Sequence, residues 1–173
     1  MKDEISLFIS RTLALKSVHS GKYFSKIITM DGIYFSTLKP IDLLNKACLR
    51  HHSSKAGRKE AAKELLKYRQ KTPFLISDEV GVFPTNGSKN PDCIWIFSHF
   101  FDAKRLDSKN TLLTFNNEIT INVPVSLYTV TKQKTRLHTL LSHVQYSKNQ
   151  YISEQSLFGV KEEHTKYDTE STD

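Results

Sequence analysis

Two alternating apolar runs on either side of a turn signal lie near the start of the chain, and this pattern limits the fold most strongly. Residues 23–30 and 33–38 flank Asp31-Gly32, a dipeptide typical of tight hairpin turns. Residues 13–18 form a further alternating run. Because alternating side chains give a strand one face to bury, the first third of the chain predicts an antiparallel hairpin or meander.

Two helices are predicted after this region. Pro40 suits the first turn of a helix over residues 40–49, because its missing N–H would have no partner there. A second helix lies within residues 51–71, with Ser53 or Ser54 as its cap and an end before Pro73. Its Ala, Glu, Lys and Leu content favours a helix, although Gly57 weakens it.

The remainder predicts more strands and one further helix. We expect strands at 74–76, 80–83 and 93–101, a loop at 84–91, a hairpin of 111–115 with 119–123, and a helix from Ser126 to about His143. The predicted fold is therefore α+β, mostly antiparallel sheet with two or three helices and a flexible acidic C-terminal tail. We divide the chain into a domain of residues 1–146 and a regulatory tail of residues 147–173.

The charge balance favours a polyanionic partner. Lys and Arg number 25 against 18 Asp and Glu, a formal net charge of +7. Residues 154–173 hold six acids and two bases, which leaves +11 for the rest. Nucleic acid is the first candidate and an anionic membrane surface the second. The sequence shows no membrane span or secretory signal and only two cysteines, so we expect a cytoplasmic, nucleoid-associated protein.

One predicted helix carries a row of cations. Lysines recur at every fourth position, which places them on one face of the helix: Lys55, Lys59, Lys63 and Lys67. Such a row suits phosphate oxygens, and Arg58 and Arg69 flank it. The alternative is a solvated face whose partners are Glu60 and Glu64. A second basic cluster comprises Lys132, Lys134, Arg136 and His138, and two clusters favour DNA over the alternative.

Metal binding and catalysis have weaker signals. A Cys₂His₂ zinc site could be drawn from Cys48, His51, His52, Cys93 and His99, but Cys93-x₅-His99 is not a standard spacing and there is no CxxC. Cys48 beside a histidine could form a nucleophile and base. No GxSxG, HExxH, P-loop or dinucleotide motif occurs. We therefore predict that the chain is not an enzyme and has no metal and no cofactor.

Several segments resemble one family in the same order. Residues 48–59 read CLRHHSSKAGRK, similar to the Cys-Arg and Ser-Ser-x-Ala-Gly-Arg-Lys signature of the ComK competence transcription factors of Gram-positive bacteria. Further likenesses are Pro73–Ile76, Phe83–Thr85, Pro91–Ile96, Thr114–Asn117 and Val123–Ser126. The resemblance extends from residue 22 to about 140. The nearest counterpart of the family's adaptor-binding Phe-Met-Leu-Tyr-Pro stretch is Ser156–Val160.

The resemblance implies a transcriptional activator of DNA-uptake genes. Such proteins bind double-stranded DNA at paired A·T-rich boxes, largely through the minor groove, bend it, act as homo-oligomers and are controlled by an adaptor of a Clp protease. On this basis we predict DNA contacts from the shared signature and the cation row: Arg50, Ser53, Ser54, Lys55, Arg58, Lys59 and Lys63. The alternative is a non-catalytic protein-interaction regulator that binds an acidic partner.

Overall fold

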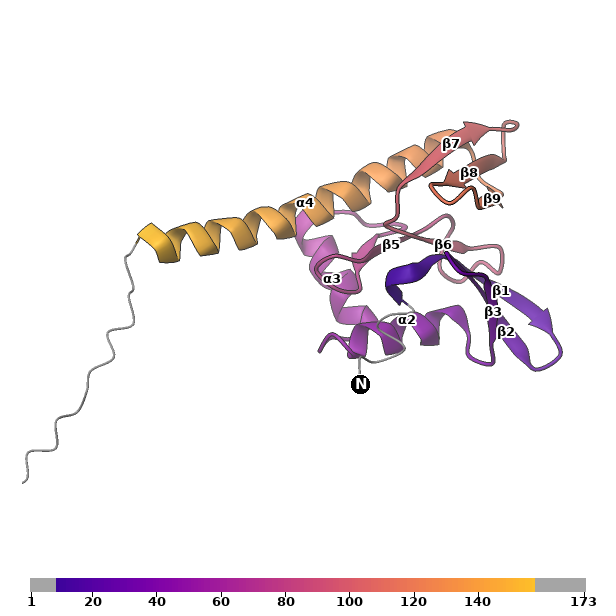
Figure 1. The fold of residues 1–173 in the computed structure, drawn as a ribbon, viewed down its shortest axis with the longest axis horizontal. Coiled ribbons are helices and arrows are strands. Elements are labelled where there is room, and N and C mark those ends of the chain that lie inside the picture. Colours follow the sequence, from indigo (N-terminus) through magenta and orange to yellow (C-terminus); the bar gives the residue numbers. More distant parts are fainter. Residues whose placement is uncertain (1–8, 158–173) are drawn as a thin grey trace, which may run out of the picture.

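Two antiparallel sheets of unequal size organise the protein. The computed structural model describes residues 9–157, with side chains for residues 9–152 (Figure 1). The larger sheet has the strand order β3-β2-β1-β6-β5-β4, and the smaller sheet has the order β7-β8-β9. The strands are β1 (Thr12–Ser20), β2 (Tyr23–Thr29), β3 (Ile33–Ser36), β4 (Phe74–Leu75), β5 (Gly81–Pro84), β6 (Ile94–Phe97), β7 (Phe101–Arg105), β8 (Thr111–Phe115) and β9 (Thr120–Val123). The helices are α2 (Pro40–Leu49), α3 (Lys55–Leu66) and α4 (Leu127–Leu157). This is the predicted α+β, mostly antiparallel fold.

The larger sheet is covered on both faces. On β6, Ile94 and Ile96 pack with the smaller sheet and α4, whereas Trp95 and Phe97 pack with α2. Successive strand residues point to opposite faces, so this continuous apolar run fills two cores at once. For Ile94–Phe97, the first part of the strand predicted over residues 93–101, burial on both faces is confirmed.

The predicted N-terminal meander and first helix are also confirmed. β2 pairs with β1 on one side and with β3 on the other, both antiparallel. Gly32 has φ 153°, a backbone conformation that favours glycine. Pro40 begins α2, as predicted, and Leu44, Ala47 and Cys48 form the buried face of this helix.

The expected strand over residues 93–101 is wrong in its second half. β6 ends at Phe97, and Phe101 begins β7 in the smaller sheet. Ser98 closes β6, because its Oγ accepts a hydrogen bond from the Gly81 amide at 2.9 Å and its amide donates to the Gly81 carbonyl at 2.9 Å. The chain therefore crosses between sheets at residues 98–100. The strand β7, which pairs along its length with β8, was missed.

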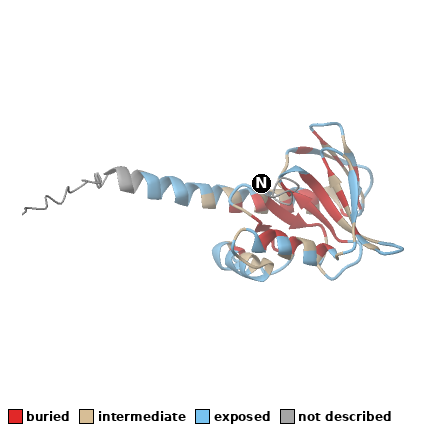
Figure 2. Ribbon diagram, turned by 60° about the horizontal axis from the view of Figure 1, so that its bottom comes forward, coloured by how far each residue is buried: buried red, intermediate tan, exposed pale blue. Residues whose placement is uncertain are grey.

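The last helix is longer than predicted. Its start is confirmed by the Ser126 Oγ, which accepts a hydrogen bond from the Thr129 amide at 3.3 Å. It continues past His143 to Leu157, and its exposed C-terminal part projects from the body (Figure 2). Beyond the predicted end, Lys148 Nζ lies 2.6 Å from the Asp78 carboxylate in the β4–β5 turn. Residues 147–157 of the expected tail are thus helical, and residues 158–173 lie outside the described part.

No helix within residues 9–157 has both the length and the apolar character needed to cross a bilayer.

The first half of α4 is fastened to the segment between α3 and β4 by polar contacts that we call the α4 clamp: Gln133, Arg136, Tyr68, Gln70 and Lys71. Gln133 is buried, and its Nε2 donates to the carbonyls of Lys71 at 2.7 Å and Pro84 at 2.8 Å. The Arg136 guanidinium stacks 4.2 Å from the centre of the Tyr68 ring and donates to the Gln70 carbonyl at 3.0 Å. The clamp holds the end of the α3 region against the sheet.

Removing the Gln133 amide should therefore destabilise the whole fold. We expect Gln133→Ala to lower the free energy of unfolding by about 2–4 kcal/mol, because two backbone carbonyls lose their buried donor. Urea unfolding followed by the fluorescence of the single tryptophan, the buried Trp95, measures this. The exposed His138→Ala on the same helix is the control and should change stability by less than about 0.5 kcal/mol. Equal midpoints for the two variants would contradict the role of the clamp.

Candidate nucleic-acid interface

The cation-bearing helix α3 is positioned by its first turn. Ser54 is the N-cap, and its Oγ accepts a hydrogen bond from the Gly57 amide at 3.0 Å. The Lys55 amide donates to the Asn45 side chain of α2 at 3.0 Å. His52 has φ 61°, a left-handed conformation that lets the chain reverse between the helices. The choice left open between Ser53 and Ser54 as cap is thereby resolved, and Ala62 is the buried residue of α3.

Arg58 points back toward the turn that precedes its helix. Its Nη2 donates to the His51 carbonyl at 2.9 Å, and its residue is half-buried. Its Nε is buried without a hydrogen-bond partner. Guanidinium groups that brace a backbone carbonyl in this way hold loop geometry. The guanidinium of Arg58 is therefore engaged within the protein, as is the hydroxyl of the Ser54 cap.

The predicted lysine row does lie on one face of α3. Lys55 and Lys59 are half-buried and Lys63 is exposed. Burial lowers the pKa of Lys59, and the charges of Lys63 and Lys55 lower it further. Among the described residues, no carboxylate forms an ion pair with these three lysines. The row is thus a set of mutually repelling cations, an arrangement that a polyanion would stabilise.

The acidic partners expected in the alternative interpretation are mostly absent from the row. Glu64 pairs with Lys67 at 2.7 Å, at the exposed C-terminal end of α3. Lys67 ends the helix in a left-handed conformation, φ 57°. This pair engages the fourth predicted lysine, and the first three have no ion-pair partner among the described residues.

Two shallow depressions extend the basic surface beyond α3. One, of about 270 Å³, is lined by Lys59 together with Lys71, Gly87 and Ser88, among others. The second, of about 530 Å³, shares Ser88 and Trp95 with the first and adds cationic or titratable residues from other segments: His19, Lys39 and Lys89. We call Lys39, Lys59, Lys71 and Lys89 the basic groove. No regular spacing in the sequence indicates this groove, because its members come from four separate segments.

The remaining predicted contacts, Arg50 and Ser53, line neither depression. Arg50 is exposed at the C-terminal end of α2, where its amide donates to the Lys46 carbonyl at 3.3 Å. Ser53 is half-buried in the α2–α3 turn. The seven predicted contact residues thus extend from the end of α2 through the α2–α3 turn and along α3 as far as Lys63.

Two of the four residues in the second predicted basic cluster, Lys134 and Arg136, are used inside the protein. Lys134 Nζ donates to the Phe101 carbonyl at 2.8 Å and lies 4.4 Å from the centre of the Phe101 ring. Arg136 belongs to the α4 clamp, and Lys132 lies over the ring of Tyr128 at 5.7 Å. Cations that stack on rings and bond carbonyls as Lys134 and Arg136 do serve packing, whereas Lys132 and His138 are exposed.

Of the candidate zinc and nucleophile residues, the two cysteines lie in the core, whereas His51 and His99 are half-buried and His52 is exposed. Cys48 and Cys93 are buried free thiols, and burial raises the pKa of Cys48 to about 11. A thiol with such a pKa is protonated and unreactive at neutral pH. Within the described residues, no three His, Cys, Asp or Glu side chains come together to hold a metal.

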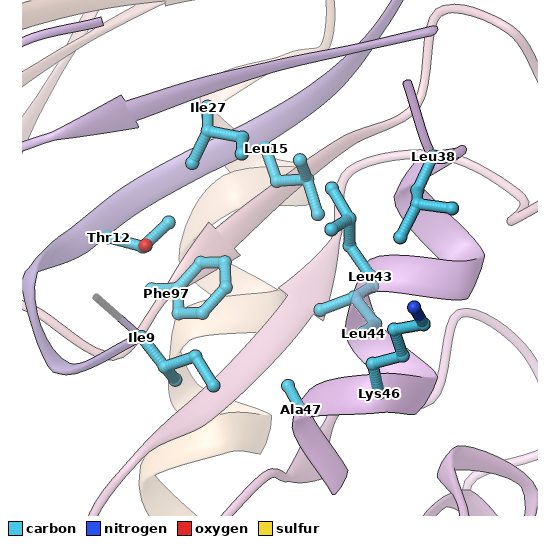
Figure 3. A pocket seen from close by; sticks show the side chains of 10 residues that line it. All are labelled: Ile9, Thr12, Leu15, Ile27, Leu38, Leu43, Leu44, Lys46, Ala47 and Phe97. Carbon is cyan, nitrogen blue, oxygen red and sulfur yellow. The ribbon is translucent and has the colours of Figure 1, made fainter. Parts of the chain in front are cut away.

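A further cavity of about 220 Å³ separates α2 from the larger sheet (Figure 3). Its lining is almost entirely aliphatic and aromatic, with Ile9, Leu15, Ile27 and Phe97 on one side and Leu43 and Leu44 on the other. Thr12 and Lys46 are the polar residues of this lining, which contains no acid, histidine or cysteine. It therefore offers no acid–base pair for catalysis.

Comparisons with known proteins agree with the signature at the start of α3. The family model described as "ComK protein" matches residues 4–149. The competence transcription factor of Bacillus subtilis (strain 168) is 32% identical over 151 residues, which cover 84% of this chain and 79% of that protein. No solved structure gives a significant match. Because the family model spans most of the chain and so does the curated relative, the chain belongs to the ComK family.

Proposed function

We propose that the chain activates transcription of competence genes by binding double-stranded DNA with the lysine row of α3 and the basic groove beside it. The name of the Bacillus subtilis relative, a competence transcription factor, supports the biological role. The observation that carries the binding proposal is the placement of Lys55, Lys59 and Lys63 on one face of α3, where no described carboxylate forms an ion pair with them. The release of counterions from phosphates would favour the binding of DNA by such a row.

We assign the phosphates and the bases to different parts of the surface. The lysines of the row neutralise backbone phosphates, which fixes the position of the protein but reads no sequence. The exposed Arg50 and Arg69 flank the row, and the loop from Asn86 to Asn90 forms one wall of the basic groove. Arginine and short polar side chains suit a narrow A·T-rich minor groove, where the potential is most negative. We therefore propose paired A·T-rich boxes as the target.

Arg58 has a positioning role in this scheme. Its bond to the His51 carbonyl joins the start of α3 to the turn that carries Ser53 and Ser54. The α3 helix buries little of its own surface, so it depends on such bonds for its orientation. Control by a Clp-protease adaptor stays a prediction, since the side chains of Ser156–Val160 lie outside the described residues.

Removing one lysine of the row should weaken binding to every DNA sequence. We expect Lys63→Ala to reduce affinity for specific and non-specific duplex alike, and to lower the slope of log K against log salt by about 1. Fluorescence anisotropy over a salt series measures both quantities. Lys104→Ala, an exposed lysine on β7 in the smaller sheet, removes the same charge at a distance and should leave the slope unchanged. An affinity that does not depend on salt would overturn the proposal.

Loss of the Arg58 guanidinium should have a different signature. We expect Arg58→Met to lower both the urea midpoint and DNA affinity, while the salt slope stays that of the unmodified protein, because no phosphate contact is removed. Paired unfolding and anisotropy measurements test this. If the slope fell by about 1 with stability unchanged, Arg58 would be a direct phosphate contact instead.

Base composition should matter as well as charge. Unlabelled duplex with paired A- and T-rich boxes should displace a labelled probe at concentrations at least about tenfold below those of a G·C-rich duplex of equal length, since the narrow groove differs between them. Equal competition by both duplexes would leave only non-specific binding. If neither duplex displaced a bound acidic polypeptide, the alternative function, a regulator that binds an acidic protein partner, would be favoured.

A further inference from the structure

The strand β3 forms an edge of the larger sheet, and no other strand of the described residues pairs with its outer side. Three successive side chains are exposed there: Ile33 by 54%, Tyr34 by 47% and Phe35 by 50%. The strand contains neither a charged residue nor a proline. Natural proteins usually blunt a free edge with such residues, because unpaired backbone groups invite another strand. An apolar and unprotected edge therefore indicates a pairing surface.

The backbone of β3 fixes which groups face outward. Thr29 donates its amide to the Gly32 carbonyl at 2.9 Å, so Gly32 bonds inward to β2. The register then continues as Ile28 with Ile33 and Lys26 with Phe35. Because inward and outward bonding alternate along an antiparallel strand, the amides and carbonyls of Ile33 and Phe35 point away from β2. Together they offer two donors and two acceptors.

We propose that β3 pairs antiparallel with β3 of a second copy of this chain, with Tyr34 on the two-fold axis. In this register Ile33 lies opposite Phe35 of the other copy, and the two strands exchange four hydrogen bonds. A centre at Ile33 or at Phe35 would place residues 31 or 37, which lie outside the strand, in the bonded positions. The Tyr34 centre is therefore the register that uses every outward group of the strand.

A second copy fits this edge better than an unrelated peptide. The outward groups of β3 are complementary to the same groups after a two-fold rotation, as an isologous interface requires. Residues 32–38 contain no charge, so no like charges meet at the contact. Ile33 and Phe35 form apolar cross-strand pairs, which stabilise sheets more than alanine pairs do. The joined sheets would be continuous across the dimer.

The pairing should be weak in the free protein and stronger on DNA. A strand of four residues buries little area, and two bodies from a chain of net charge +7 repel each other. Two boxes on one duplex would raise the effective concentration of the second protomer. This role at paired boxes rests on the proposed function, whereas the strand pairing itself does not.

A cysteine placed on the two-fold axis tests the register directly. Opposite residues at a non-hydrogen-bonded position lie close enough for a disulfide, so Tyr34→Cys should give a covalent dimer under mild oxidation on a non-reducing gel. The native Cys48 and Cys93 are 0% and 3% exposed and should not interfere. Tyr128→Cys, at a 73% exposed site on α4, is the control for random collision. Equal cross-linking of the two variants would overturn the proposal.

A charge introduced into β3 tests whether the strand pairing causes self-association, and this test needs no new covalent bond. Phe35→Lys should abolish the self-association seen by sedimentation equilibrium and reduce binding to paired boxes by on the order of tenfold, with single-box affinity maintained. Leu106→Lys, at a 50% exposed site, adds the same charge elsewhere and should change neither. Unaltered self-association in Phe35→Lys would also overturn the proposal. If the unmodified protein bound no DNA, the proposed function would fail while the Tyr34 cross-link still decided the pairing.

Discussion

The buried amide of Gln133 is the contact on which the arrangement of the functional surface depends. Its one side-chain nitrogen bonds the carbonyls of Lys71 and Pro84, which belong to the segment after α3 and to the end of β5. The same two segments enter the basic groove, through Lys71 and through the loop that follows Pro84. A single core residue of α4 therefore sets the distance between the two sides of the groove. The groove is a product of packing between distant segments.

The lysine row tolerates its own repulsion because its helix is held by polar bonds at both ends. The lysine row itself destabilises α3, because like charges one helical turn apart repel each other. The Ser54 cap, the Asn45 side chain and the Arg58 bond fix the first turn, and Lys67 closes the last. These bonds orient the helix while leaving most of its surface to solvent. Stability and electrostatic function are thereby carried by different residues.

Local patterns predicted most of the elements but not the contacts between them. The hairpin around Asp31-Gly32, the start of α2 at Pro40 and the cap at Ser54 follow from rules that span a few residues. The break at Ser98 does not, because it depends on bonds to Gly81 in another strand. Likewise the cations of α4 look available in sequence, yet Arg136 stacks on Tyr68. The spacing of charges indicates where cations lie on a helix, but it does not indicate which neighbouring carbonyls and rings bind them.

The unprotected edge and the cationic helix place opposing demands on the same molecule. Apolar residues at Ile33 and Phe35 favour association, while uncompensated lysines on each copy oppose it through repulsion. Phosphates would neutralise the repulsion between the lysines and leave the attraction between the apolar edges. A duplex that engages the lysine rows of both copies would therefore promote pairing. By linkage, pairing must then raise DNA affinity by the same factor. A short edge with few hydrogen bonds suits this coupling. A larger interface would associate without DNA, so that pairing would no longer depend on DNA.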